Sequence, residues 1–335
     1  MKQYKTDKIR NIGLVAHGGA GKTSLAEALL FNAKAIDRLG KVDEGTSTMD
    51  FDQEEIKRNI SISAAVAPCE WKDCKINIVD TPGYFDFAGE VKGALRAVDT
   101  AVVLACAVSN VEVGTEKVWQ YAEEAGLPKV LFINKMDREN ANFYKVLDTA
   151  REIFGNNVVP VQLPIGSQDS FKGIVDLVEM KAYTPNEGEI PADLLDEAMS
   201  YREMLVDAVA EEDDELMMKY LEGEELTNEE VALCLKKALA SGKVCPVLCG
   251  SSLKNIGITA LMDFIVEYLP SPANIEEYKG KLPKADQETT RKPSAGEPFS
   301  ALVFKTLADP YVGKLTLFRV ISGTLKSDSQ VYNAN

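Results

Sequence analysis

The chain has 335 residues, of which 45% are hydrophobic and 27% charged, as in a soluble globular protein of two or three domains. Its formal net charge of −15 argues against binding to free nucleic acid, because such binding depends on Lys and Arg. The N-terminus lacks the apolar core of a secretory signal, and no apolar run is long enough to span a bilayer. We therefore expect a cytoplasmic monomer with no membrane partner.

Apolar segments and helical patterns alternate through the first 155 residues. We predict strands at 11–16, 66–71, 75–80, 100–108 and 129–134, an amphipathic helix at 21–31, and further helices at 87–98, 113–126 and 139–154. The strands at 66–71 and 75–80 are expected to form a hairpin. The other strands are almost uniformly apolar and alternate with helices, so we predict an α/β fold with a mostly parallel sheet covered on both faces. Cys106 lies inside one of these strands and is expected to be a buried thiol.

The pattern changes at about residue 157. Short strands are predicted up to 183, strongly helical sequence over 191–240, a strand over 244–252 and a helix over 255–269. Thr227 and Glu230 have the spacing of a helix capping box. We interpret the chain as a first domain (1–270) with an inserted α+β subdomain (about 160–243), followed by a polar linker (271–297) and the first strands of an incomplete β-barrel (298–335). Since the barrel is incomplete, we expect a fragment of a longer protein.

The first motif, AHGGAGKTS, follows a predicted strand and opens a predicted helix. It consists of Ala16, His17, Gly18, Gly19, Ala20, Gly21, Lys22, Thr23 and Ser24. In a phosphate-binding loop of this type, backbone N–H groups hold phosphates at the helix N-terminus. Lys22 would then reach the β- and γ-phosphates, and the Thr23 hydroxyl would bind Mg²⁺. A glycine-rich turn without a ligand is the alternative, because Ala16 stands where the pattern has its first glycine.

The second motif, DTPG, ends another predicted strand and consists of Asp80, Thr81, Pro82 and Gly83. An Asp at the end of a buried strand can hold Mg²⁺ through a water molecule, and the Gly83 N–H can sense a γ-phosphate. On its own, DTPG is also a common turn, so it predicts a site only together with other motifs.

The third and fourth motifs are NKMD at 134–137 and GSS at 250–252. The Asp137 carboxylate can accept from the N1–H and the exocyclic amine of guanine, a donor pair that adenine lacks. Asn134 and Lys135 would brace this loop and the base. Ser251 and Ser252 are expected to direct backbone N–H groups at guanine O6.

All four loops follow the carboxyl ends of predicted strands, which is where open α/β sheets bind ligands. Together they predict a site for GTP or GDP with Mg²⁺. A phosphoryl-transferring P-loop kinase is the competing enzyme class, and it is disfavoured because NKMD and GSS would then have no role.

The sequence resembles elongation factor G and its close relatives among translational GTPases, over essentially all 335 residues. The resemblance is carried by AHGGAGKTS, TMDFDQEEIKRNISIS (48–63), DTPGYFDFAGEV (80–91), INKMDR (133–138) and PVLCGSSLKNIGITALMDFIVEYLPSP (246–272). It implies a P-loop GTPase that hydrolyses GTP to GDP and phosphate with Mg²⁺. It also implies the ribosome as partner, in translocation, recycling or ribosome protection.

Carried over residue by residue, the resemblance is close in the nucleotide loops: Lys22, Thr23, Asn134, Lys135, Asp137 and Ser251 match the family pattern. Ser61 stands where the family has a Thr that binds Mg²⁺, and it retains the hydroxyl. Gly18 and Gly19 replace a bulkier apolar residue and an Asp, and Asn59 replaces a Gly.

Tyr84 is the most consequential departure, because the family has there the His that orients the hydrolytic water. Tyrosine is a poor proton acceptor at neutral pH, although its hydroxyl can orient water. His17, in the phosphate loop, is no positional substitute. We therefore expect a divergent paralogue that hydrolyses GTP slowly in isolation, with Lys22 and Tyr84 as catalytic candidates. A GTP/GDP switch with vestigial hydrolysis, in which Tyr84 only packs, is the alternative.

Overall fold

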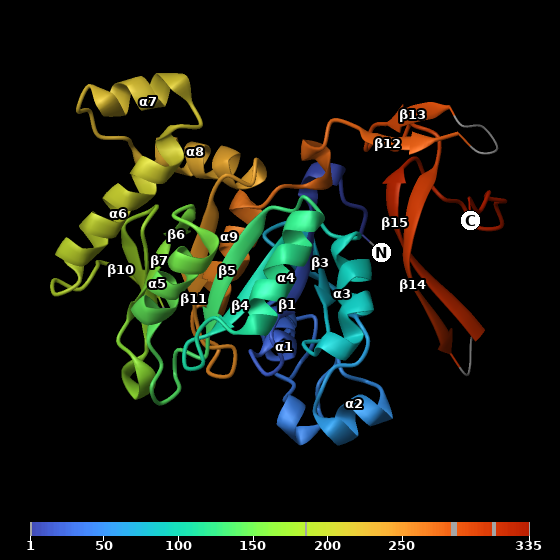
Figure 1. Ribbon diagram of the computed structural model, residues 1–335, viewed down its shortest axis with the longest axis horizontal. Coiled ribbons are helices and arrows are strands. Elements are labelled where there is room, and N and C mark those ends of the chain that lie inside the picture. The colour runs from blue at the N-terminus through green and yellow to red at the C-terminus, as the bar shows by residue number, and fades with distance from the viewer. Residues whose placement is uncertain (1, 185, 283–286, 310–312, 335) are drawn as a thin grey trace.

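A seven-stranded sheet forms the centre of the computed structural model, which describes residues 2–184, 186–282, 287–309 and 313–334 (Figure 1). The strand order is β2-β3-β1-β4-β5-β11-β6. The strands are β1 (Ile9–Ala16), β2 (Ala65–Trp71), β3 (Cys74–Asp80), β4 (Thr100–Cys106), β5 (Lys129–Asn134), β6 (Val158–Pro160) and β11 (Cys245–Cys249). Only β2 and β3 pair antiparallel, so the predicted mostly parallel sheet with one hairpin is confirmed.

Helices cover the sheet, which explains why β4 and β11 are buried along their whole length. The helices are α1 (Lys22–Asn32), α3 (Ala88–Leu95), α4 (Val113–Glu124), α5 (Phe143–Phe154) and α9 (Ile258–Tyr268). α1 packs against α9, and α3 packs against α4, which lies across the near face of the sheet in Figure 1. The short helix α2 (Gln53–Arg58) lies on the connection between α1 and β2.

Helix α1 differs from the amphipathic helix that we predicted. Between Lys22 and Leu30 every side chain is buried except that of Ser24, because α1 contacts β1, β2, β3 and α9. Glu27 is fully buried, and its Oε1 accepts from the Ser47 hydroxyl at 2.9 Å and from the N–H groups of residues 48 and 49 at 2.6 and 3.0 Å. A buried carboxylate thus ties the segment after α1 to the helix itself.

A second sheet and three helices follow β6, as the α+β pattern predicted. The strands run in the order β10-β9-β8-β7 and are antiparallel. They are β7 (Gln162–Ile165), β8 (Gly173–Asp176), β9 (Lys181–Tyr183) and β10 (Glu187–Gly188), and the helices are α6 (Leu195–Ala210), α7 (Asp214–Leu221) and α8 (Asn228–Ala240). Within the described ranges, no helix is both long enough and apolar enough to cross a bilayer.

The segment predicted as a linker contains a small hairpin. Strands β12 (Tyr278–Lys281) and β13 (Glu288–Arg291) pair antiparallel, while residues 283–286 of the linker lie outside the described residues. Their sequences, YKGK and ETTR, lack apolar alternation, so backbone pairing forms the hairpin where periodicity does not indicate one. The last strands, β14 (Ser300–Asp309) and β15 (Gly313–Ser322), form a separate antiparallel pair beside α3 (Figure 1).

Short 3-10 segments connect several of these elements. They are Thr6–Lys8, Val42–Glu44, Phe85–Phe87, Gln168–Ser170 and Pro272–Asn274. Two of them adjoin the sequence motifs: Phe85–Phe87 follows DTPG, and Gln168–Ser170 is joined to NKMD by the bond from Gln168 N–H to Met136 O (3.1 Å).

All six cysteines are buried and unpaired, and they are distributed over strands and one helix: Cys69, Cys74, Cys106, Cys234, Cys245 and Cys249. The buried thiol predicted at Cys106 is confirmed. Burial raises the pKa of Cys69 and of Cys245 to about 12, so these thiols stay protonated and pack as small apolar groups.

The capping box predicted for α8 is confirmed, and it provides a test of the fold. Thr227 Oγ1 accepts from the Glu230 N–H at 3.3 Å, and Glu230 Oε2 accepts from the Thr227 N–H at 2.8 Å. Thr227→Ala removes the accepting hydroxyl, so we expect a loss of about 1 kcal/mol in unfolding free energy, measured by urea denaturation. Thr227→Ser keeps the hydroxyl and should stay within about 0.5 kcal/mol of wild type. Equal losses in both variants would contradict a capping role.

Candidate nucleotide-binding site

The four motif loops lie at one edge of the central sheet. β1, β3, β5 and β11 are mutually parallel, and they end at Ala16, Asp80, Asn134 and Cys249, directly before or within the four motifs. β1 has β3 on one side and β4 on the other, so the strand order reverses at the first loop. Open α/β sheets bind ligands at such a reversal, at the carboxyl ends of their strands.

The phosphate loop turns sharply into α1 at Gly21. Gly21 has φ 96°, and a Cβ there would lie 2.5 Å from Asn134 Nδ2, so both backbone and packing require glycine. Lys22 is buried, and its Nζ lies 3.4 Å from Ala16 O and 3.3 Å from His17 O. Burial lowers the pKa of Lys22 to about 8, and the nearby carboxylates of Asp80 and Asp50 oppose this shift. An anion at the helix N-terminus would stabilise the charged form of this lysine.

Asn134 joins three of the four loops. Its Nδ2 donates to Ala20 O in the phosphate loop at 3.0 Å, and its Oδ1 accepts from the Ser252 N–H and hydroxyl at 3.1 and 3.0 Å. Lys135 adds a bond from Nζ to Gly19 O at 2.6 Å, and its backbone is left-handed at φ 65°. The phosphate loop, NKMD and GSS are therefore one hydrogen-bonded unit.

The GSS loop is used differently from what the sequence predicted. The Ser251 N–H donates to Ile256 O at 2.9 Å, and the Ser252 N–H donates to Asn134 Oδ1 at 3.1 Å, so both N–H groups have acceptors within the protein. A β-bridge between Ser251 and Ile256 closes the loop back on itself. In this structure, GSS braces Asn134 instead of presenting its N–H groups to guanine O6.

The residues predicted to hold Mg²⁺ are brought together. Thr23 Oγ1 donates to Asp80 Oδ2 at 2.7 Å and lies 3.1 Å from Ser61 Oγ. Ser61 Oγ also donates to Asp50 Oδ1 at 2.8 Å. Sequence analysis did not single out Asp50, because nothing distinguishes this acid from its neighbours until the chain folds back onto α1.

Besides Glu27 Oε2 on α1, three shielded carboxylate oxygens have no hydrogen-bond partner among the described residues: Asp50 Oδ2, Asp80 Oδ1 and Asp137 Oδ1. The first two belong to the cluster around Thr23, where two carboxylates and two hydroxyls match the oxygen ligands that Mg²⁺ prefers. Burial raises the pKa of Asp80 to about 7, against the opposing charge of Lys22, and burial also raises the pKa of Asp50. A bound cation would stabilise the charged forms of both carboxylates, so this residue set fits a magnesium ion.

The Asp137 oxygen lies in the NKMD loop and does not belong to that cluster. It belongs to the loop that Asn134 and Lys135 fasten to residues 19–20. An acceptor that is shielded yet unsatisfied costs stability unless a ligand donates to it. Its chemistry fits the paired N–H donors of a guanine edge.

The segment that carries Ser61 is held by a buried glutamate on α2. Glu55 Oε1 accepts from the N–H groups of Ile62 at 2.8 Å and Ser63 at 3.0 Å. Asn59 ends α2 with φ 53°, a left-handed conformation that asparagine tolerates better than most residues. The departure at Asn59 is therefore compatible with the turn that leads to Ser61.

Tyr84 lies against the phosphate loop. A Cβ added to Gly18 would sit 3.2 Å from Tyr84 Cζ, and one added to Gly83 would sit 2.6 Å from Lys22 Nζ. The Tyr84 side chain is nevertheless 47% exposed, so its ring rests on Gly18 with the other face open. The turn before it is fixed by the bond from Thr81 Oγ1 to Leu14 O at 2.7 Å, and Pro82 is buried.

His17 faces another element. Its Nε2 lies 3.5 Å from Glu112 Oε1 at the start of α4, and a Cβ on Gly114 would lie 2.4 Å from His17 Nδ1. This placement agrees with the prediction that His17 does not take the position of a water-orienting histidine after DTPG.

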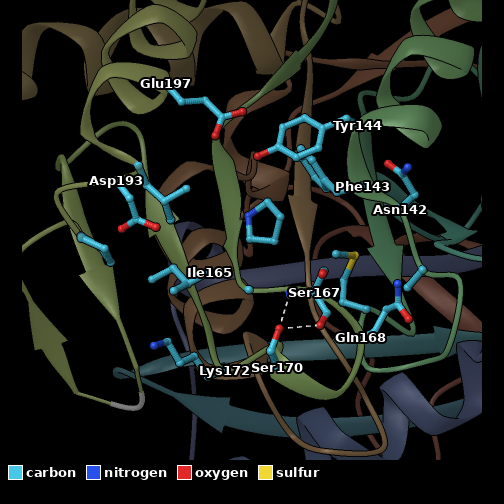
Figure 2. A pocket seen from close by; sticks show the side chains of 16 residues that line it. Asn142, Phe143, Tyr144, Ile165, Ser167, Gln168, Ser170, Lys172, Asp193 and Glu197 are labelled. Carbon is cyan, nitrogen blue, oxygen red and sulfur yellow. Dashed lines mark hydrogen bonds between the residues drawn. The ribbon is translucent and has the colours of Figure 1, made fainter.

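A cavity of about 690 Å³ lies next to the NKMD loop (Figure 2). It is lined by the start of α5, by residues 164–172 and by the start of α6, and it includes Phe143, Ser167 and Glu197. It shares Met136 with NKMD, but Lys22, Asp80 and Asp137 do not line it. The cavity therefore borders the NKMD loop without including the residues predicted to contact nucleotide or metal.

Together, the parallel sheet and the four loops at one of its edges define a P-loop nucleotide-binding protein. The family model for the elongation factor Tu GTP binding domain matches residues 7–271, and that for elongation factor G domain 2 matches residues 298–335. The chain belongs to the elongation factor Tu GTP-binding-domain family, as a translational GTPase of the elongation factor G type.

A solved structure agrees with this assignment. A crystal structure of a protein from Thermus thermophilus superposes with a TM-score of 0.85 at 34% sequence identity, over 96% of this chain. The match covers 47% of the Thermus chain, so the present chain spans about half the length of that protein.

The raised pKa of Asp80 predicts a pH dependence of stability. The folded-state pKa of about 7 lies above the ordinary value of 3.8, so folded protein binds a proton that unfolded chain releases. This contribution to stability is complete below about pH 4 and is lost as the pH rises through about 7. In EDTA, wild type should lose stability relative to Asp80→Asn between pH 5.5 and 7.5, by up to about 1.4 kcal/mol per pH unit. Parallel urea-denaturation profiles for the two proteins would contradict the assigned shift.

Proposed function

We propose that this chain binds GTP and GDP with Mg²⁺, hydrolyses GTP to GDP and phosphate, and acts in association with the ribosome. The observation that carries the proposal is that unsatisfied carboxylate oxygens lie in two separate groups of residues, each hydrogen-bonded to the phosphate loop. Asp50 and Asp80 lie beside Thr23, and Asp137 lies in the loop fastened to residues 19–20. A magnesium-bound guanine nucleotide supplies a cation and a pair of N–H donors to these two places.

Each loop then has a distinct role in the proposed site. The backbone N–H groups of residues 18–23 hold phosphate oxygens at the start of α1, and Lys22 adds a positive charge. Thr23 and Ser61 offer hydroxyl ligands to the metal, with Asp80 and Asp50 behind them. Mg²⁺, when bound, would neutralise charge on the phosphates.

Base recognition rests on Asp137. Its free oxygen accepts from guanine N–H groups, while Asn134 and Lys135 hold its loop against the phosphate loop. Adenine has no such pair of donors on the corresponding edge, so the site would select guanine.

Ribosome association follows from the family. A translational GTPase of the elongation factor G type acts there, and we propose a cytoplasmic monomer with that partner. We also propose the division into 1–270, 271–297 and 298–335, with residues of about 160–243 as an insertion. The proposal covers translocation, recycling and ribosome protection alike, and the present chain spans 47% of the Thermus chain that it matches.

A GTP/GDP switch with vestigial hydrolysis is the second candidate, and Tyr84 favours it. The ring rests on Gly18 and is half-exposed, as expected for a side chain that packs on the loop instead of activating water. Both candidates share the same binding site and differ only in turnover.

Asp137→Asn tests base recognition. The amide presents a donor where the carboxylate accepts, so we expect GTP affinity to fall by about 10²-fold or more and xanthosine triphosphate to become the better ligand. Isothermal titration with both nucleotides measures the change. Asp169→Asn alters an exposed acid on a neighbouring loop and should leave both affinities at wild-type values. Unchanged GTP binding by Asp137→Asn would remove this loop from the base site.

Substitutions of Tyr84 separate the two candidate functions. We expect the single-turnover rate constant of GTP hydrolysis by the wild-type chain to be well below about 1 s⁻¹. A poorly positioned water raises the activation barrier even when the phosphates are held in place. If the hydroxyl orients water, Tyr84→Phe should lower this rate and leave nucleotide affinity unchanged. If the ring only packs, Tyr84→Phe should be silent and Tyr84→Ala should weaken GTP binding. Fast hydrolysis by wild type without ribosomes would contradict slow turnover altogether.

A further inference from the structure

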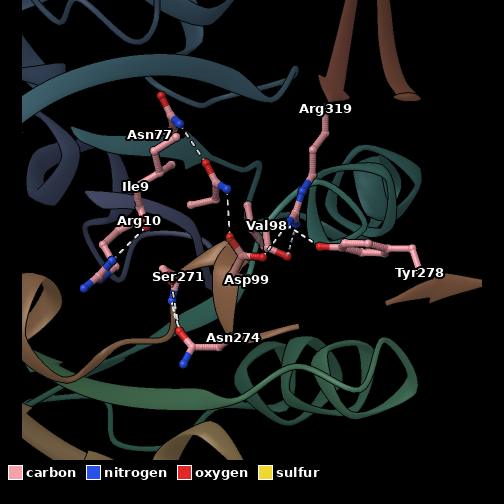
Figure 3. A network of polar contacts seen from close by, with 10 residues as sticks. Ile9, Arg10, Asn77, Val98, Asp99, Ser271, Asn274, Tyr278 and Arg319 are labelled. Carbon is pink, nitrogen blue, oxygen red and sulfur yellow. Dashed lines mark hydrogen bonds and ion pairs between the residues drawn. The ribbon is translucent and has the colours of Figure 1, made fainter. Parts of the chain in front are cut away.

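The β14–β15 pair contacts the first 270 residues through two largely shielded basic side chains, Arg319 and Lys305. Arg319 forms an ion pair with Asp99 and donates to Val98 O at 2.9 Å and to the Tyr278 hydroxyl at 2.9 Å (Figure 3). Val98 and Asp99 directly precede β4, so this contact lies at the amino end of the strand, away from the nucleotide loops. It fastens the strand pair to the end of the sheet opposite the nucleotide loops.

Lys305 makes a contact of a different kind. Its Nζ donates to Ala64 O at 2.6 Å and to Glu90 Oε2 at 2.9 Å, and Glu90 Oε2 also accepts from the Ala64 N–H at 2.8 Å. Lys305 is only 8% exposed. The ammonium, the carboxylate and the Ala64 peptide groups therefore form a closed, mostly shielded unit.

A β-bulge accompanies this contact. Val303 pairs with Phe318 and Lys305 with Leu317, so Phe304 is an extra residue in β14. Bulges change the direction in which neighbouring side chains point. The backbone of β14 also comes close to α3, because a Cβ added to Gly93 would lie 3.2 Å from Phe304 O. The strand is thus shaped to bring a lysine onto α3.

The two partners of Lys305 lie just beyond the proposed metal- and phosphate-facing segments. Ala64 follows Ser61 by three residues, and Glu90 lies on α3, which follows the turn of Tyr84. Glu55 already holds residues 62 and 63 from the α2 side. Lys305 therefore fixes the downstream end of the Ser61 segment to the helix after the DTPG turn.

Burying an ammonium is costly unless its donors are used, so the two acceptors must both be in place for Lys305 to be accommodated. The position of Ala64 relative to Glu90 is then coupled to the docking of β14. Moving the Ser61 segment away from Thr23 would strain the hydrogen bonds among Lys305, Glu90 and Ala64. Moving the phosphate loop alone would leave these bonds intact.

We propose that Lys305 is a positioning residue for nucleotide binding, which holds Ala64 and Glu90 together and so favours the arrangement in which Ser61 lies beside Thr23 and Asp80. The inference rests on the proposed function and deepens it. In the proposed site a diphosphate would be held mainly by the phosphate loop, whereas the γ-phosphate of a triphosphate would face the DTPG turn, which lies close to Lys22, and Ser61, which lies close to Thr23. Lys305 therefore supports the triphosphate-bound state more than the diphosphate-bound state.

Lys305→Met keeps the length of the side chain and removes its charge. With Mg²⁺ present, we expect GTP affinity to fall at least about 5-fold more than GDP affinity, measured by titration with fluorescent analogues of both. In nucleotide-free protein, hydrogen exchange of peptides covering residues 62–64 should become faster, because the Ala64 N–H loses a fixed acceptor. Lys314→Met, an exposed lysine on the same strand pair, should change neither quantity.

A purely structural role would give a different result. Lys305→Met would then lower the melting temperature, and the ratio of GTP to GDP affinity and the exchange at 62–64 would stay at wild-type values, which would overturn the inference. If Lys305→Met does not fold, Glu90→Gln tests the same unit from a partly exposed position and should lower the GTP to GDP preference in the same direction. An unchanged preference in that variant would also overturn it. If wild type binds neither nucleotide, the proposed function fails, and unaltered exchange at 62–64 in Lys305→Met separately rejects the structural link.

Discussion

The amide of Asn134 is the interaction on which the site depends. A single side chain donates to the phosphate loop and accepts from the GSS loop, so three loops from separate strands share one hydrogen-bonded centre. This works because β1, β5 and β11 are parallel and present their carboxyl ends together. An asparagine is suited to the position, because its amide carries a donor and an acceptor on one rigid plane.

Sequence periodicity predicted the sheet and the succession of strands and helices along the chain, because buried parallel strands are apolar throughout. The four loops were predicted from the motifs at the ends of these strands. Periodicity did not predict the acids that position the segment of residues 47–63 beside those loops. Glu27, Asp50 and Glu55 are separated along the chain and look like ordinary surface acids until folding buries them against backbone N–H groups and hydroxyls. The β12–β13 hairpin was missed for a related reason, since its pairing uses backbone groups that have no side-chain pattern.

Two departures from the family sequence become intelligible in three dimensions. Asn59 occupies a left-handed position that glycine would also satisfy. Gly18 leaves room for the ring of Tyr84, which a side chain at residue 18 would press at 3.2 Å. The backbone of the turn thus accommodates Asn59, and the ring of Tyr84 fills the space beside Gly18. Neither departure moves the four loops away from the carboxyl edge of the sheet.

Because all six thiols are buried, their alkylation in solution can measure local opening of the fold. Cys69, Cys74 and Cys106 lie in β2, β3 and β4, Cys245 and Cys249 lie in β11, and Cys234 lies in α8. A thiol must be exposed to solvent and ionised before it can react with an alkylating reagent. All six thiols are buried in the folded chain, so none is exposed there. Each thiol therefore reports the local opening of its own element: the β2–β3 hairpin, the central strands β4 and β11, or helix α8.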